Sequence, residues 1–205
     1  MKISYNWLKA YVPDIPEEDK LADIFTYHLC EVESIEKLTE GDFLFDLGIL
    51  PNRAHDLLSH QGIAKELSGL LGISFKDPTP LYKIPESKPT NLKVEIMGES
   101  CRRYSARIIR NVKVGPSPEW VVKHLESIGQ RSINNIVDAT NIVMYDCGQP
   151  THAFDLKKLV SEKIVIRNAE ANTELPVVGR EGIVAKLLGT DLVITDGDKN
   201  LALGG

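Results

Sequence analysis

The sequence lacks the excess of basic residues that is typical of proteins built only to hold nucleic acid. Its 24 Lys and Arg residues are outnumbered by 29 Asp and Glu residues, which gives a net charge of −5. The imbalance is uneven, because residues 1–76 hold 7 basic and 13 acidic residues whereas residues 77–205 hold 17 and 16. A protein that only grips a phosphate backbone is usually basic. Any contact with nucleic acid must therefore be local or shared with a partner chain.

Long apolar runs are also missing, so the sequence predicts neither a secretory signal nor a membrane span, and we expect a cytoplasmic protein. Cysteine is scarce: Cys30, Cys101 and Cys147 lie far apart, with no C-x-x-C pair and no clustered histidines. This spacing predicts reduced thiols, no disulfide and no bound metal.

The sequence contains none of the short motifs that usually mark nucleotide sites or serine hydrolases. It has no G-x-x-x-x-G-K loop, no G-x-G-x-x-G fingerprint and no G-x-S-x-G elbow. We therefore expect no cofactor in this chain and no synthetic reaction with ATP by the chain alone.

The elements that are present predict a small helical module over residues 1–76. Ser4 is placed to cap a helix through residue 12, and Pro16 to open a second helix at its first turn. Alternating residues predict a strand over 43–49, and apolar spacing predicts a long helix over 56–71 that ends at Gly72.

Four prolines in residues 77–91 predict an extended linker, and so a domain boundary, before a second domain over 92–205. In that domain we expect helices over 117–129 and 137–147, and a short helix capped by Asp155. Strands are expected over 92–96, 104–112, 163–167, 182–185 and 191–195, the last in a hairpin with 201–203. The irregular order of helices and strands predicts an α+β or mixed α/β fold.

The densest polar stretch is residues 134–155. On a helix over 137–147, Asp138, Asn141 and Tyr145 would share a face with Thr140 beside them. Such a face either lines a pocket or is simply solvated. His152 follows in a turn, where its imidazole either reaches a pocket or lies at the surface.

One basic cluster occurs, in residues 102–113. By the period of two along the expected strand, Arg103 and Arg107 project from the same side. They form either a strip that contacts phosphates or a solvated face of the sheet.

Four blocks, in order, make the chain recognisable. MKISYNWLKAYV begins it, PNRAHDLLSHQGIAKEL spans 51–67, RYSARIIRNVKVGPSPEW and INNIVDATNIVMYDCGQPTHAFDL fall within 103–156, and GTDLVITDGDKNLALGG ends it. The chain resembles, over nearly its whole length, the N-terminal part of bacterial phenylalanyl-tRNA synthetase β subunits, including a portion of the editing domain.

The resemblance implies a ligase that works as a heterotetramer of two α and two β subunits. The α subunit would hold ATP, with Mg²⁺, and phenylalanine, whereas the β subunit would bind tRNA(Phe) and hydrolyse mischarged tyrosyl-tRNA. The family's editing residues match Thr140, Asn141 and His152, and a glycine-rich turn that lines the ligand matches Gly204 and Gly205. Arg103 and Arg107 become candidate tRNA contacts; no membrane or DNA partner is implied.

The chain departs from the family pattern in two places. Only residues 33–42 separate Val32 from Phe43, so the oligonucleotide-binding domain that the family usually inserts there is absent. The sequence also stops at Gly205, before the glutamate that reads the tyrosine hydroxyl in the family, so the editing pocket is expected to be incomplete.

Two other functions fit parts of the pattern. One is a free-standing deacylase that edits mischarged tRNA in trans, which would need a complete pocket. The other is a non-catalytic module that binds RNA or protein, although the acidic residues 1–76 argue against direct DNA binding.

Overall fold

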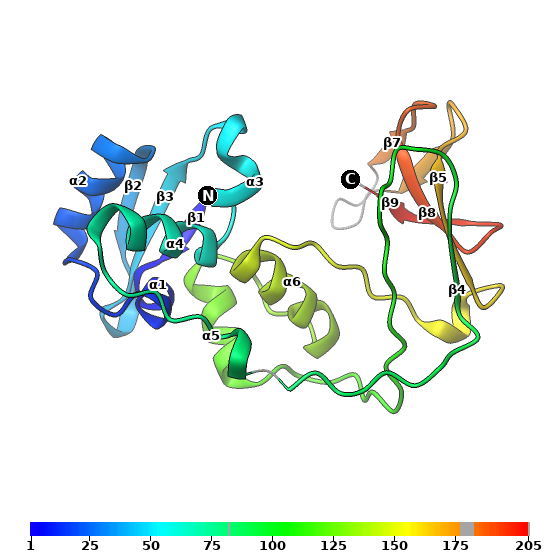
Figure 1. Ribbon diagram of the computed structural model, residues 1–205, viewed down its shortest axis with the longest axis horizontal. Helices are drawn as coiled ribbons and strands as arrows, with labels where there is room; N and C mark the ends of the chain where they lie inside the picture. The colour runs from blue at the N-terminus through cyan, green and yellow to red at the C-terminus, as the bar shows by residue number, and fades with distance from the viewer. Residues whose placement is uncertain (82, 177–182, 205) are drawn as a thin grey trace. The chain divides into compact units, whose positions relative to one another are not determined.

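The computed structural model describes residues 1–81, 83–176 and 183–204. Its contacts divide the chain into two compact units (Figure 1). The N-terminal unit comprises Met1–Pro85 and Lys113–Ala153, and the sheet unit comprises Glu86–Val112 and Phe154–Gly205. Each unit is described by itself below.

The N-terminal unit is built on a three-stranded antiparallel sheet with the strand order β1-β3-β2. Its strands are β1 (Lys2–Ser4), β2 (Glu31–Lys37) and the predicted β3 (Phe43–Gly48). Ile3 pairs with Phe45 and Val32 with Leu47. A short 3-10 helix, η1 (Thr39–Gly41), joins β2 to β3, so the two strands form a direct hairpin.

Helices α1 (Tyr5–Tyr11), α2 (Glu18–His28) and α4 (His60–Leu71) gather around these strands (Figure 1). The predicted cap of α1 is present, because the Ser4 hydroxyl accepts a hydrogen bond from the Trp7 amide at 3.1 Å. Gly72 ends α4 in the left-handed conformation, with φ 64°, as its position predicted.

The long helix predicted over 56–71 is broken, which corrects the sequence reading. The 3-10 helix η2 (Pro51–Arg53) leads into the short α3 (Ala54–Leu57), and Ser59 then caps α4 by accepting from the Gly62 amide at 3.0 Å. Because a serine cap needs an extended backbone, the chain must leave the helical conformation at Ser59.

Aromatic and aliphatic side chains from all these elements form one core. Its fully buried members include Leu8, Leu21, Phe25, Phe45, Leu57, Ile63 and Leu67.

Helices α5 (Glu119–Ser127) and α6 (Asn135–Cys147) belong to this same unit. The sequence predicted them in a domain over 92–205, whereas the contacts of the structure group them with residues 1–85. Ile128 is buried in the N-terminal core, and Ile142 and Tyr145 pack against it. The apolar side chains of this hairpin therefore pack against residues 1–76. The boundary at Pro85 does fall within the segment predicted to be a linker.

The sheet unit holds a four-stranded sheet with the order β4-β5-β8-β9. Its strands are β4 (Lys93–Ile96), β5 (Lys163–Asn168), β8 (Leu192–Thr195) and β9 (Asn200–Leu203). β4 runs parallel to β5, and the other pairs are antiparallel, including the predicted hairpin of β8 and β9. β6 (Glu174–Pro176), which the sequence did not predict, pairs with β7 (Val184–Lys186).

The strand predicted over 104–112 is wrong. These residues have no regular secondary structure. Residues 105–112 make no hydrogen bond with any other residue that the structure describes. An isolated extended segment is not a strand until a neighbour accepts its backbone groups. Asn111, with φ 61°, also interrupts the extended path.

Two short 3-10 helices, η3 (Thr79–Leu81) and η4 (Leu156–Lys158), complete the described elements, and Asp155 caps η4 as predicted. Separate helices and small sheets confirm the α+β class. Over the described residues, no helix has the length and apolarity needed to cross a bilayer.

Candidate functional site

Helix α6 carries two of the predicted site residues, and its sequence defines both of its ends. The Asn134 side chain accepts hydrogen bonds from the amides of Ile136 and Val137, at 3.0 and 3.1 Å. Gly148 closes the other end with φ 77°. An asparagine cap and a left-handed glycine fix the helix over residues 135–147.

Asp138 is fully buried near the start of α6, so it does not contribute to an open polar face as predicted. Its carboxylate accepts from the hydroxyls of Ser117 at 2.5 Å and Ser132 at 2.6 Å, and from the Ile133 amide at 2.9 Å. Burial alone would raise the pKa of Asp138, but these hydrogen bonds hold it below the usual range of aspartate. Asp138 therefore connects α6 by hydrogen bonds to the segments just before and just after α5.

Asp146 makes a second set of hydrogen bonds at the C-terminal end of α6. Its carboxylate accepts from the Trp7 indole Nε1 at 2.9 Å, the Gln61 amide Nε2 at 3.1 Å and the Tyr11 hydroxyl. These donors come from α1 and α4. The end of α6 is thereby bonded to residues more than eighty positions earlier in the chain.

His60 makes the companion contact and lies fully buried beside Trp7, with ring centroids 3.8 Å apart. Its Nε2 accepts from the Ser4 amide at 3.2 Å, and its Nδ1 donates to the Tyr145 carbonyl at 2.8 Å. Because Nε2 accepts, the ring is neutral with its proton on Nδ1. Burial lowers the pKa of His60 to about 3, helped by the nearby His124 and opposed by the bond to Tyr145. The sequence did not predict a role for His60.

Thr140 and Asn141 lie between these two sets of contacts, and both are half-buried. The Thr140 hydroxyl donates to the Val137 carbonyl at 2.7 Å, one turn back in its own helix. Successive helical residues are about 100° apart, so Thr140 lies nearly opposite Ile142, which faces the core. Thr140 therefore lies on the side of α6 away from the N-terminal core, and Asn141 lies at its flank.

His152 is exposed in the segment that follows α6, and Gly205 lies outside the described residues. The structure thus places Thr140 and Asn141 next to each other and His152 five residues beyond the end of their helix. Tyr145, which was predicted to share a polar face with Asn141, instead packs against the core.

Two of the hollows on the surface of the N-terminal unit have linings that do not include Thr140, Asn141 or His152. The larger, of about 490 Å³, lies between α5 and α6. Its apolar lining comes from Pro118, Trp120, Val121, Ala139, Ile142 and Val143. The smaller, of about 350 Å³, shares Gln61 and Cys147 with it.

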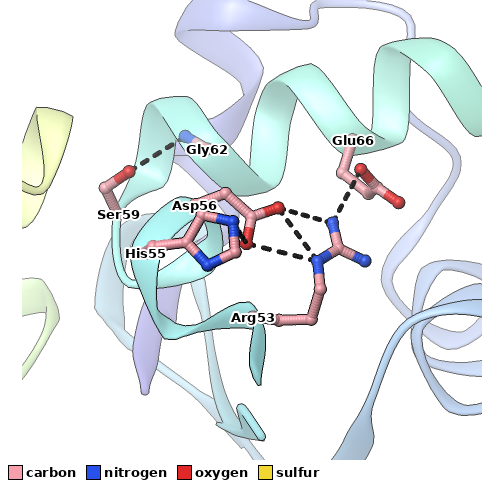
Figure 2. Close-up of polar contacts among 6 residues, drawn as sticks. All are labelled: Arg53, His55, Asp56, Ser59, Gly62 and Glu66. Carbon is pink, nitrogen blue, oxygen red and sulfur yellow. Dashed lines mark hydrogen bonds and ion pairs between the residues drawn. The ribbon is translucent and has the colours of Figure 1, made fainter. Parts of the chain in front are cut away.

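The smaller hollow adjoins an ion-pair cluster that joins η2, α3 and α4. Figure 2 shows the Arg53 guanidinium between two carboxylates, with Nη2 2.6 Å from Asp56 and 3.0 Å from Glu66. The hydrogen bonds to Asp56 and Glu66 raise the pKa of Arg53, and Arg53 lowers the pKa of Asp56. Arg53 is thus already paired with protein carboxylates, which suits a structural role better than binding an anion.

Arg103 and Arg107 are exposed in the segment that lacks regular structure. Three other exposed cations, Arg102, Arg110 and Lys113, lie in the same stretch. The predicted cluster is therefore open to solvent, although it does not lie on a strand.

Comparison with known proteins places the chain in a family. A model of the B3/4 domain matches residues 100–205. The chain belongs to the B3/4 domain family. It is 39% identical over its full length to a phenylalanine–tRNA ligase β subunit from Rhodopirellula baltica, and 43% identical over 83% of its length to that of Syntrophotalea carbinolica. The resemblance to these β subunits that the sequence analysis described is confirmed.

The chain spans 30% of the Rhodopirellula protein and 21% of the Syntrophotalea protein. A solved N-terminal fragment of the phenylalanyl-tRNA synthetase β subunit from Pyrococcus horikoshii aligns with all of this chain and 60% of its own, at 14% identity and a TM-score of 0.45.

Proposed function

We propose that this chain is the N-terminal part of a phenylalanine–tRNA ligase β subunit and that it contributes to tRNA binding and to hydrolysis of mischarged tyrosyl-tRNA(Phe). The observation that carries the proposal is the match to β subunits along the whole chain, with the B3/4 domain over residues 100–205. In the complete enzyme, a partner α subunit would supply the synthetic site with ATP and Mg²⁺.

Residues on and after α6 supply the chemistry of editing. Hydrolysis of an aminoacyl ester needs a positioned water, stabilisation of the oxyanion and a hold on the amino acid. The Asn141 amide and the Thr140 hydroxyl can hydrogen-bond the ester or the water, and the His152 imidazole can hold the terminal ribose or orient the water. Gly205, which lies outside the described residues, is a further candidate editing residue by the resemblance.

The exposed cations near residue 103 would hold the tRNA backbone. Arg103 and Arg107 are open to solvent, and no acidic residue occurs between Glu99 and Glu119. A short basic segment of this kind can contact phosphates even though the chain as a whole is acidic.

The proposal is tested in a full-length β subunit assembled with its α partner. Replacing Asn141 or His152 with alanine should slow hydrolysis of tyrosyl-tRNA(Phe) by about 10²–10³, the usual cost of one positioned hydrogen bond in catalysis. Phenylalanylation should stay near normal. His55→Ala is the matched control, because His55 is an exposed histidine on α3.

A structural role for these side chains predicts another pattern. Both substitutions would then lower the melting temperature, and synthesis and editing would fall together. Unchanged hydrolysis in both variants would end the assignment of these residues to editing.

A further inference from the structure

We propose that His60 and Asp146 are positioning residues for editing, through which the N-terminal module of residues 1–76 sets the placement of helix α6. The inference rests on the proposed function, because it concerns how Thr140 and Asn141 are presented to the tRNA end. Neither His60 nor Asp146 needs to touch the substrate.

Asp146 bonds the C-terminal end of α6 to two other helices. One carboxylate oxygen accepts from the Trp7 indole at 2.9 Å, and the other accepts from the Gln61 amide at 3.1 Å. Trp7 lies on α1 and Gln61 on α4. Because the two oxygens face donors on two different helices, the carboxylate has little freedom to shift or turn.

His60 adds a second fixed point one residue earlier on α6. Its imidazole bridges the Ser4 amide, at the start of α1, and the Tyr145 carbonyl. The stacked Trp7 ring holds the plane of the imidazole. A shift of α6 along its axis would break the bond to Tyr145 and leave a buried donor unsatisfied, which is costly.

The two ends of α6 depend on different parts of the chain. Asp138 is bonded to Ser117, Ser132 and Ile133, which all lie around the α5–α6 hairpin itself. The hydrogen bonds of Tyr145 and Asp146, with the apolar packing of Ile142, join the helix to residues 1–76. Loss of these contacts would leave the hairpin intact while its placement on the module loosens.

Asn141 lies one helical turn before Tyr145, so the anchored end sets its position directly. A displacement of about 1 Å at a catalytic group can cost about 100-fold in rate. Weakening the anchor should therefore lower the rate of hydrolysis without removing any group that meets the tRNA.

The test uses full-length β subunit assembled with its α partner and carrying Asp146→Asn or His60→Gln. We expect kcat for hydrolysis of tyrosyl-tRNA(Phe) to fall by about 10- to 100-fold, while KM for the tRNA stays within about twofold and phenylalanylation is unchanged. Leu21→Ala is the control, because Leu21 is buried on α2 in the same core and its truncation destabilises the module without touching the anchor.

An equal fall in kcat in Leu21→Ala at a matched loss of melting temperature would show a merely structural role and overturn the proposal, as would unchanged kcat in both anchor variants. Asn141→Ala, measured alongside, distinguishes failure of this inference from failure of the proposed function. If Asn141→Ala leaves hydrolysis unchanged, the proposed editing site itself is wrong. If the anchor variants do not assemble, Trp7→Phe carries the test, because it removes the indole N–H that donates to Asp146 while an aromatic ring remains beside His60. A folded Trp7→Phe enzyme with unchanged kcat would equally overturn the proposal.

Discussion

A histidine whose two ring nitrogens both have backbone partners has no free nitrogen to accept a proton. At neutral pH, His60 satisfies the Ser4 amide and the Tyr145 carbonyl at once. Protonation of Nε2 would place a second donor against the Ser4 N–H inside a closed core. The buried ring therefore stays neutral, and folding becomes sensitive to acid.

The pH dependence of stability follows from this. The pKa of His60 is about 3 in the folded chain, whereas an unfolded histidine has a pKa near 6.5. Because the unfolded state binds the proton more readily, the contribution of His60 is complete above pH ~6.5 and is lost as the pH falls towards 3. By pH 5 the free energy of unfolding should drop by about 2 kcal/mol from this residue.

Denaturant unfolding between pH 7.5 and 5 measures the effect. His60→Gln should be less stable at neutral pH but should lose most of this pH dependence, whereas the exposed His55→Gln should keep it. Equal slopes in the wild type and His60→Gln would contradict the neutral, buried ring.

Two glycines on α4 provide another matched comparison. A Cβ at Gly62 would lie 1.8 Å from the Asp56 carbonyl oxygen, whereas a Cβ at Gly69 would meet nothing within 4 Å. Gly62→Ala should therefore destabilise the chain by about 3 kcal/mol, because backbone must move to admit the methyl group. Gly69→Ala should be neutral or stabilise by up to about 1 kcal/mol, since alanine favours the helix. Thermal unfolding of both variants checks this; similar melting temperatures would refute the close approach.

Residues whose partners are local were predictable from the sequence, and those with distant partners were not. Ser4, Gly72 and Asp155 act at element ends as expected, because a cap depends only on neighbouring residues. Asp138 was assigned to an open face, but its partner Ser117 lies 21 positions away. No local pattern reveals that contact.

At the scale of elements, the prediction of a strand was correct for β3 and wrong for residues 104–112. β3 lies between β1 and β2 and has hydrogen-bond partners on both sides. Residues 105–112 have no hydrogen-bonded partner among the described residues. Periodicity indicates that a segment suits a sheet; pairing decides whether it forms a strand.

The basic residues 102–113 are expected to contribute to tRNA binding. If Arg103 and Arg107 contact tRNA phosphates, Arg103→Ala with Arg107→Ala should weaken tRNA binding and reduce the slope of log K against log salt by about 1–2. Arg131→Ala, an exposed arginine in the N-terminal unit, is the control. Binding titrations at several salt concentrations measure both quantities. A double variant with the wild-type slope would remove these residues from the tRNA interface.

At the scale of the whole molecule, the sequence predicted the fold class, whereas its expected domains and the two units of the structure divide the chain differently. One boundary between the units, after Pro85, lies in the proline-containing segment 77–91. Helices α5 and α6 follow that boundary in sequence, yet they pack with residues 1–76. Chain order alone does not show that a segment packs against a core formed earlier in the chain. In the sequence, Ile128 and Tyr145 look like apolar residues of any helix, and nothing indicates which core they contact.

The candidate site illustrates the same division between local and distant information. The resemblance named Thr140, Asn141 and His152, and the local sequence placed the first two correctly on a helix that ends at Gly148. What holds that helix, namely His60 and the donors to Asp146, was not predicted. Those contacts join residues separated by 85 to 139 positions.

The central claim, that α6 and the segment after it meet the aminoacylated end of tRNA, is tested most directly by mapping where that end binds. Hydrogen–deuterium exchange of a full-length β subunit with its α partner would be measured with and without a non-hydrolysable 3′-tyrosylamido-adenosine. We predict slower exchange in residues 139–155, and no such change in Asn141→Ala at the same ligand concentration. Protection confined to other parts of the subunit, with residues 139–155 unchanged, would contradict the account.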